Sequence, residues 1–372
     1  MSKTISNLVS TARASNEHGT FDHTRAICEQ IFAVDPGNVA GLNAYVTATK
    51  VTADDPVFTR LQEYVGLTGL PVEVRSQLHF MLGKCFADLG RVEDAFATLV
   101  KANDLKSTRY DPVAMRGAAT QLITAVAAAD PVQLAPIAPR MVFIIGMPRS
   151  GTSVLAAALG AHSQITNLGE QTALGAAMRD DQGSVSPMTF LKGLSAERLE
   201  TARDAYLDAI GASDRSTPVL VDKMPENYWL AWAIPMMFPD ALIVHMSRAR
   251  LATVWSCYRH DFLDGHAYSY DFAHCLAQHD LCSDLTSAWR KTWPRNWMSL
   301  ALSQFSNQPE RGLGAILKRL GLQFEEACLA PASGGAVATL SKWQVRQGID
   351  QKIASEWEAY KPLIEAKWGA LL

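Results

Sequence analysis

The chain of 372 residues has no long apolar run, no strong excess of either charge and no paired cysteine motif. Its longest apolar candidates, 122–129 and 231–238, are short or interrupted by proline, whereas a membrane-spanning helix needs about 20 apolar residues. The N-terminus is polar and lacks the basic and apolar regions of a signal peptide. We therefore expect a cytoplasmic protein that does not contact a membrane.

The small net charge of −3 argues against a general basic surface for nucleic acid. The six cysteines are scattered and show no metal-ligand spacing, so buried thiols are expected rather than disulfides or a zinc site. Hydrophobic residues make up 48% of the chain and charged residues 19%, which is typical of a globular protein. The length allows two domains.

Residues 1–130 show helical patterns that recur in pairs. One pair spans 19–36 and 39–51. A second pair has a small residue where its helices would cross, a turn glycine and an alanine in the following helix, at Gly83, Gly90 and Ala95. The pairs resemble tetratricopeptide repeats, and a plain helical bundle is the alternative. Three prolines in 131–140 indicate a linker, so the remaining 141–372 would form a second domain.

Four apolar runs follow the linker, with helical stretches between them, at 142–145, 165–168, 217–221 and 241–246. This alternation predicts an α/β domain in which helices cover both faces of a parallel sheet. Ligands of such sheets bind at the carboxyl ends of the strands. Gly146, Glu170, Asp222 and Ser247 all fall there, so one crevice is expected. From Tyr270 onward the chain is expected to be helical.

The segment 142–153 combines a short apolar strand, a glycine-bounded loop and the start of an apolar helix. This arrangement points backbone N–H groups and a helix N-terminus at a phosphate. The interval from Gly146 to Gly151 is that of a nucleotide P-loop, but Thr152 stands where an ATP- or GTP-binding loop has lysine. The cation of this segment is Arg149, which lies inside the loop. A loop without the lysine fits Mg-nucleotide hydrolysis poorly.

Five blocks in order carry a resemblance to a known family: 146–153, 169–170, 219–227, 241–256 and 341–347. They resemble the sulfotransferases that use 3′-phosphoadenosine 5′-phosphosulfate (PAPS). The match is to the bacterial type with an N-terminal tetratricopeptide region, which is related to the tyrosylprotein sulfotransferases. It covers the expected second domain and, more weakly, the N-terminal helices. The resemblance implies a P-loop-type parallel sheet flanked by helices, with PAPS as donor, 3′-phosphoadenosine 5′-phosphate (PAP) as product and no metal.

The resemblance also implies roles for individual residues. The loop residues would bind the 5′-phosphosulfate: Arg149, Ser150, Gly151, Thr152 and Ser153. Lys223 would stabilise the leaving phosphate, and Arg248 and Ser256 would bind the 3′-phosphate. Ser341 and Arg346 would cover the nucleotide.

Glu170 is the candidate general base, because a carboxylate beside the crevice can accept the proton of an acceptor hydroxyl. His162 and His245 are the alternatives. The sequence departs from the family pattern after Arg248, where Ala249 and Arg250 replace the usual Asp and Pro. The missing Asp would cap the next helix or orient the arginine, and Arg250 is expected to add positive charge for the phosphate.

The acceptor stays open: a protein tyrosine, a saccharide and a small molecule all present a hydroxyl, and the helical repeats would bind a peptide or protein acceptor. A P-loop nucleotide-dependent kinase is one alternative function, but it would need lysine in place of Thr152 and a magnesium site. A non-catalytic repeat scaffold is another. The presence of Arg149, Lys223, Arg248 and Glu170 argues against it.

Overall fold

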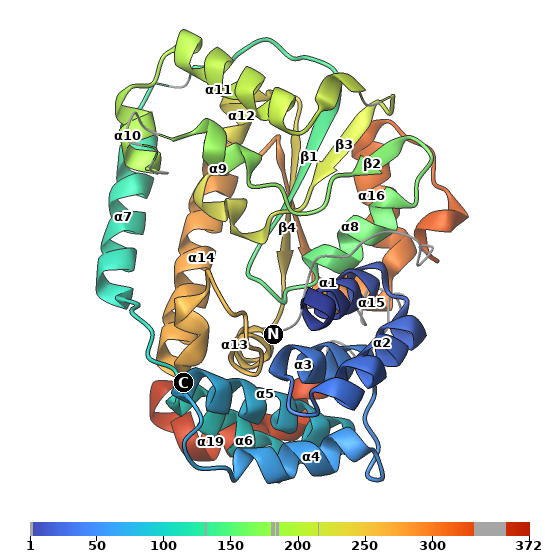
Figure 1. Ribbon diagram of the computed structural model, residues 1–372. Coiled ribbons are helices and arrows are strands. Elements are labelled where there is room, and N and C mark those ends of the chain that lie inside the picture. Colours follow the sequence, from blue (N-terminus) through green and yellow to red (C-terminus); the bar gives the residue numbers. More distant parts are fainter. Residues whose placement is uncertain (1–2, 131, 180–182, 184–185, 215, 331–354) are drawn as a thin grey trace.

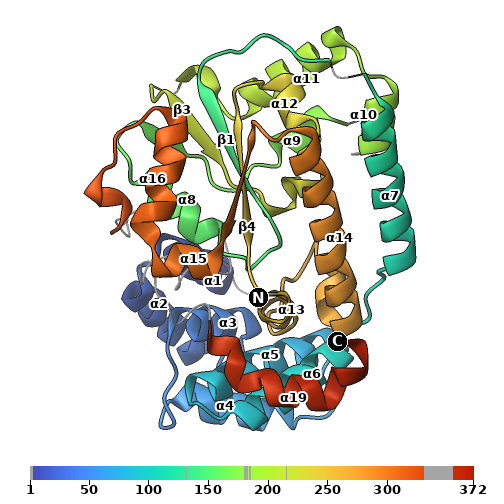
Figure 2. The same cartoon turned by 180° about the vertical axis from the view of Figure 1, so that it is seen from behind.

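A parallel β-sheet lies between two layers of helices, and further helices from the N-terminus lie beyond the carboxyl ends of its strands (Figures 1 and 2). The computed structural model describes residues 3–130, 132–179, 183, 186–214, 216–330 and 355–372. The α/β class and the helical N-terminal region predicted from the sequence are both confirmed.

The N-terminal helices pack against one another, α1 with α2, α2 with α3 and α5 with α6; they are α1 (Lys3–His18), α2 (Phe21–Val34), α3 (Val39–Ala48), α4 (Pro56–Val65), α5 (Val72–Asp88) and α6 (Val92–Asp104). Helices α5 and α6 approach closely at Gly83, where an added Cβ would lie 2.7 Å from Cγ of Leu99. Gly90 turns the chain between them with φ 72°, and Ala95 is fully buried. The small residues therefore have the packing roles that the sequence predicts.

Helix α7 (Pro112–Ala128) stands apart from these pairs and runs beside α14 (Phe272–Thr292) (Figure 1). Asp111 caps it, accepting the backbone N–H groups of Val113 and Ala114 at 3.0 Å. Tyr110, just before the cap, donates a hydrogen bond to the side chain of Gln278 on α14. This helix thus packs with the sheet domain, and the division of the chain at residue 130 stays a prediction.

The sheet has five parallel strands in the order β2-β3-β1-β4-β5. Four are the predicted apolar runs: β1 (Arg140–Ile145), β2 (Ile165–Asn167), β3 (Val219–Asp222) and β4 (Leu242–Ser247). The fifth, β5 (Trp297–Ala301), lies in the region expected to be helical, so that expectation was wrong there. Strand β5 lies at the edge of the sheet and has the exposed Ser299 at its centre. Its sequence therefore contains no continuous apolar run from which a strand could be predicted.

Alternate side chains of β1 serve the two faces of the sheet. Val142 and Ile144 pack with α8 (Thr152–Gly160) and α16 (Pro309–Leu320), whereas Phe143 and Ile145 join the core of the opposite face. The opposite face is covered by α11 (Ala196–Ala209), α12 (Ile234–Met237) and α14. On α11, Tyr206 is fully buried, whereas Ala205 and Ala209 are exposed.

The remaining elements are short and connect or cover these layers. They are α9 (Ala173–Ala177), α10 (Pro187–Lys192), η1 (Ala212–Asp214), η2 (Pro225–Trp229), α13 (Arg250–Tyr258), η3 (Ala267–Tyr270), α15 (Leu302–Asn307), η4 (Glu326–Cys328), η5 (Glu356–Tyr360), α19 (Lys361–Trp368) and η6 (Gly369–Leu371). The C-terminal helix returns to the N-terminal region, where Trp368 lies 5.5 Å from the ring of Phe96 on α6 and 4.1 Å from that of Phe272 on α14.

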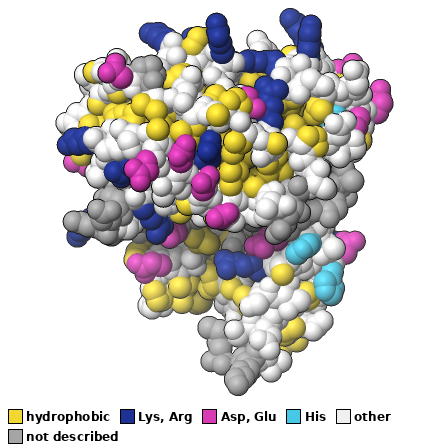
Figure 3. Space-filling model, turned by 90° about the horizontal axis from the view of Figure 1, so that it is seen from above, with side chains coloured by type: hydrophobic (Ala, Val, Ile, Leu, Met, Phe, Trp, Pro, Cys, Tyr) yellow, Lys and Arg dark blue, Asp and Glu magenta, His cyan; other side chains and the backbone are white. Residues whose placement is uncertain are grey.

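The surface has no dominant charge on the face seen in Figure 3, where hydrophobic side chains lie between scattered acidic and basic ones. The cysteines are free and buried, as the sequence predicts. In the part of the chain that the structure describes, no helix combines the length and apolar character needed to cross a bilayer.

The packing at Gly83 predicts that Gly83→Ala destabilises the protein by about 1–3 kcal/mol, because the new methyl must displace Leu99. Gly117→Ala is the matched control, since a methyl there meets nothing within 4 Å and should stabilise α7 by about 0.5–1 kcal/mol. Urea unfolding of both variants measures the difference. Equal effects of the two substitutions would contradict the close packing of α5 on α6.

Candidate functional site

The predicted site residues line up along the carboxyl edge of the sheet in the order of its strands. Glu170 follows β2, Lys223 follows β3, the loop 146–151 follows β1 and Arg248 follows β4. Neighbouring strands are about 4.8 Å apart, so the four positions form one row. This is the convergence that the apolar runs and the residues after them predict.

The loop after β1 is held tightly by its neighbours. Gly146 has φ 147°, and a Cβ there would lie 2.3 Å from the carbonyl oxygen of Met246 on β4. Gly151 has φ 100°, and its Cβ would lie 2.6 Å from Cδ1 of Leu302. The backbone N–H of Gly146 donates to the carbonyl of Pro225 at 3.1 Å, which ties the loop to the segment after Lys223. Glycine is required at position 146 because the backbone of Met246 is in the way, and at position 151 because the positive φ strains any other residue.

The loop ends at the N-terminus of α8, a helix of nine residues whose N-cap is Gly151. The first N–H groups of a helix have no partner within it, and the helix dipole favours an anion there. Ser150 and Thr152 are 1% and 3% exposed. The Ser150 hydroxyl is buried and makes no hydrogen bond among the described residues. A buried hydroxyl beside a glycine cradle and a helix N-terminus fits a bound phosphate oxygen.

Two partly buried arginines lie beside the loop. Arg149, which has φ 69°, donates from Nε to Oγ of Ser256 at 3.2 Å, and Arg248 donates from Nη1 to the carbonyl of Arg149 at 3.4 Å. Burial, and after it the positive charges nearby, lower the pKa of each guanidinium to about 10. Both are still charged at neutral pH, so the site concentrates positive charge out of water. The structure thus brings Arg149, Arg248 and Ser256 together.

Arg259 is a third arginine of this cluster, which the sequence reasoning missed. It follows Ser256 by three residues, at the C-cap of α13, and its charge lowers the pKa of both Arg149 and Arg248. Its guanidinium donates to the carboxylate of Glu356 on η5 at 3.0 Å. The positive charge of Arg259, followed by those of Arg149 and Arg248, lowers the pKa of Glu356. The sequence could have indicated Arg259 by its position three residues after Ser256. It could not have indicated the partner Glu356, which lies 97 residues further along the chain.

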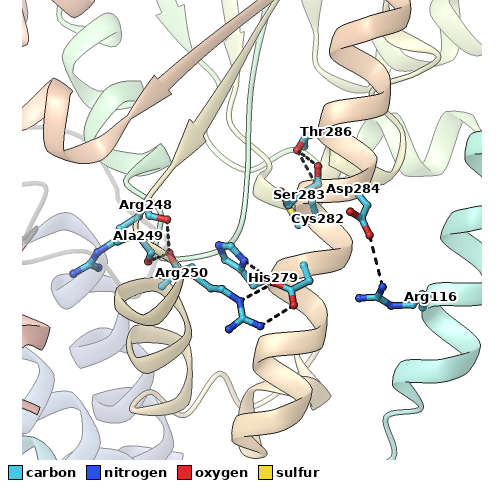
Figure 4. A network of polar contacts seen from close by, with 11 residues as sticks. Arg116, Arg248, Ala249, Arg250, His279, Cys282, Ser283, Asp284 and Thr286 are labelled. Carbon is cyan, nitrogen blue, oxygen red and sulfur yellow. Dashed lines mark hydrogen bonds and ion pairs between the residues drawn. The ribbon is translucent and has the colours of Figure 1, made fainter. Parts of the chain in front are cut away.

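Arg250 does not join the cluster, so the expectation that it adds charge for the phosphate was wrong. Its guanidinium makes two hydrogen bonds to Asp280 on α14, at 2.8 and 2.7 Å, and points away from that of Arg248 (Figure 4). Ala249 supplies no side-chain cap to α13. Instead, the hydroxyl of Thr253 bonds to the carbonyls of Arg248 and Ala249 at 3.4 and 3.2 Å.

Lys223 and Glu170 form an ion pair at the ends of β3 and β2. The lysine side chain is 4% exposed and the glutamate side chain 33%, so the carboxylate faces outward from a buried cation. Burial lowers the pKa of Lys223, and the charge of Glu170 opposes that shift. The backbone supports the pair, because the N–H of Lys223 donates to the carbonyl of Gly169 at 2.9 Å.

Asp222 lies directly beneath this pair. It is fully buried and accepts a hydrogen bond from the Tyr206 hydroxyl at 2.9 Å. Burial raises its pKa to about 7. The side chain is thus anchored inside the protein, while Lys223, the next residue, reaches the edge of the sheet.

Comparison with known proteins identifies the family. The sulfotransferase family model matches residues 139–326, just over half of the chain. The chain belongs to the sulfotransferase family. An uncharacterized protein of Aquifex aeolicus is 26% identical over 372 aligned positions, which cover 93% of this chain and 48% of that protein. This sulfotransferase therefore spans about half the length of the curated relative it matches.

Solved structures similar to this sulfotransferase include two bacterial proteins. The sulfotransferase domain of the Synechococcus PCC 7002 olefin synthase is 19% identical, with a TM-score of 0.43, over 62% of this chain and 90% of that one. A sulfotransferase of Alicyclobacillus acidocaldarius is 16% identical, with a TM-score of 0.38, over 63% of this chain and 99% of that one.

The alternative bases lie elsewhere in the sulfotransferase. His162 follows the C-terminal end of α8 and bonds through Nε2 to the carbonyl of Gln323 at 2.9 Å. His245 is inside β4, with its ring 5.9 Å from that of Trp297, and burial lowers its pKa to about 4. Glu170 is the candidate that stands at a strand end beside Lys223.

Two of the expected nucleotide contacts, Ser341 and Arg346, lie outside the described residues. Within the described ranges, no group of three or more His, Cys, Asp and Glu side chains is placed to hold a metal ion.

Proposed function

We propose that this sulfotransferase moves a sulfuryl group from PAPS to the hydroxyl group of an acceptor and releases PAP. The observation that carries the proposal is the row of groups at the sheet edge, which reads carboxylate, lysine, anion-binding loop and arginine. Sulfuryl transfer resembles phosphoryl transfer, in which catalysis depends mainly on positioning and on stabilising charge. Each group in the row has one task in such a reaction.

The donor lies along the loop and the arginine cluster. The 5′-phosphosulfate takes the N-terminus of α8, with Arg149, Ser150 and the residues 151–153 around it. The 3′-phosphate takes Arg248 and Ser256. The Ser150 hydroxyl, which makes no hydrogen bond among the described residues, and the positive charge of the two partly buried guanidinium groups support this placement, because an anion interacts favourably with each of them. Ser341 and Arg346 complete the donor site.

The reaction takes place between the loop and the ion pair. The acceptor oxygen forms a bond to sulfur while the bond between sulfur and the bridging oxygen breaks. The electron pair of that bond stays on the phosphate oxygen, next to the ammonium of Lys223. The acceptor proton passes to the carboxylate of Glu170. Because Lys223 and Glu170 are in contact, the cation for the leaving phosphate and the proton acceptor lie side by side at the edge of the sheet.

The same proposal covers the domain boundaries and the location of the protein in the cell. The N-terminal helices are a tetratricopeptide-like region over 1–130, joined by a linker, 131–140, to the sulfotransferase domain, and the protein acts in the cytoplasm. A kinase is disfavoured by Thr152 at the lysine position of a nucleotide loop. An inert scaffold is disfavoured because Arg149, Lys223, Arg248 and Glu170 are all present and converge on one edge of the sheet.

The placement of the 3′-phosphate predicts that Arg248→Ala weakens PAP binding at least about tenfold, since a charge-assisted hydrogen bond contributes roughly 1.5–3 kcal/mol. Adenosine 5′-phosphosulfate, which lacks the 3′-phosphate, should lose much less affinity. Arg250→Ala removes the neighbouring arginine, which pairs with Asp280, and should leave PAP affinity nearly unchanged. Calorimetric titration measures all three. Equal losses for both nucleotides would show that Arg248 does not contact the 3′-phosphate.

The role of Glu170 predicts that Glu170→Gln lowers turnover by about 10²–10⁴ while the affinity for PAP stays nearly the same. Glutamine keeps the size of the side chain and still accepts a hydrogen bond from Lys223, but it does not take up a proton. The loss should be smaller for nitrophenol acceptors, whose hydroxyl is already acidic. A variant that sulfates a weakly acidic alcohol at the wild-type rate would remove Glu170 from the mechanism.

A further inference from the structure

A cavity of about 490 Å³ lies next to the segments that carry Glu170 and Lys223. It lies between α7, α9, α10 and η2, and its size is typical of a site for a small organic molecule. Two lining residues are the direct chain neighbours of the reacting groups, because Gln171 follows Glu170 and Met224 follows Lys223. The cavity therefore adjoins the two segments that carry Glu170 and Lys223.

The wall of the cavity is mainly apolar. Three methionines and a tryptophan form much of it, namely Met115, Met188, Met224 and Trp229, all partly exposed. Methionine side chains adapt to the shape of a ligand and make favourable contacts between sulfur and aromatic rings. Small residues such as Ala118 leave the space open. This lining suits a flat apolar body about the size of one or two rings.

Charge is scarce around the cavity. Of the described residues that line it, only Glu226 and Arg179 are charged, and the carboxylate of Glu226 lies 3.1 Å from Nδ1 of His266. An acidic peptide would need several cations, and a saccharide would need many hydrogen-bonding groups to replace its water. Among the described lining residues, polar or charged side chains are a minority, namely Gln171, Thr172, Arg179, Glu226 and Asn227.

We infer that this cavity is the acceptor site and that the acceptor is a small, uncharged compound with an apolar ring body and a phenol-type hydroxyl. The inference rests on the proposed function and names its substrate class. The ring lies against the methionines and Trp229, and the hydroxyl points to Glu170 and to the sulfur of the donor. The hydroxyl proton goes to Glu170, and the sulfate ester forms as PAP leaves.

Helix α7 gives a matched pair of variants to test this. Ala118 is exposed and lines the cavity, so Ala118→Trp fills it, whereas Ala114, one turn earlier, is exposed and lies outside the lining, so Ala114→Trp is the control. The probes are 2-naphthol, methyl glucoside and a tyrosine peptide with acidic flanks. Transfer of labelled sulfur from PAPS gives kcat/KM for each probe, and calorimetry gives the affinity for PAP.

We expect kcat/KM for 2-naphthol to exceed that for the other probes at least about tenfold. Ala118→Trp should lower it at least about tenfold, mainly through KM, with unchanged PAP affinity and melting temperature. Ala114→Trp should match the wild type.

Failure of the wild type to bind PAP would overturn the proposed function itself. Two results would overturn the acceptor site alone, provided that PAP binds. One is a preference for the glucoside or the peptide, and the other is a turnover of 2-naphthol that Ala118→Trp does not change. If no probe is sulfated although PAP binds, equilibrium dialysis of 2-naphthol against the PAP complex decides. If 2-naphthol binds to the wild type and Ala118→Trp abolishes this binding, the acceptor site is supported. If 2-naphthol does not bind to the wild type, the acceptor site is overturned.

Discussion

The contact of Gly146 with the Met246 carbonyl is the constraint on which the rest of the site depends. No side chain fits between β1 and β4 at this point, since a Cβ would lie 2.3 Å from that oxygen. The chain can therefore leave β1 tightly, turn through the loop and begin α8 at Thr152. Because the other parallel strands end at the same edge, their terminal residues meet the loop without any long connection.

The electrostatics of the site follow from that geometry. Lys223, Arg149 and Arg248 are cations held largely out of water, where an approaching anion interacts with them more strongly than in solvent. Two carboxylates accompany them: Glu170 pairs with Lys223, and Glu356 with Arg259. Hydrogen bonds and an ion pair orient these cations, namely Arg149 to Ser256, Arg248 to the carbonyl of Arg149 and Lys223 to Glu170. The apolar cavity next to the segments that carry Glu170 and Lys223 is the proposed place for the acceptor.

Local sequence patterns made much of the fold and of the candidate site predictable. Apolar runs marked four strands, and the residues after them marked the site, because a parallel sheet brings its strand ends together. Gly83 and Gly90 likewise revealed a helical pair. What the sequence did not show depends on contacts between distant segments. Asp280, which holds Arg250, lies 30 residues away, and Glu356, which holds Arg259, lies 97 residues away. On α11, Tyr206 turns inward because its hydroxyl bonds to Asp222, which a count of apolar positions does not reveal.

The central claim is that the loop with Arg149 inside it and Thr152 after it accepts a 3′-phosphorylated sulfonucleotide rather than a nucleoside triphosphate. Calorimetric titration of the wild-type protein with PAP, ATP and Mg-ATP tests it most directly. The account predicts that PAP binds more tightly than ATP by at least about tenfold, because the 3′-phosphate adds a charged contact, and that magnesium does not improve the binding of ATP. Tighter binding of Mg-ATP than of PAP would contradict it.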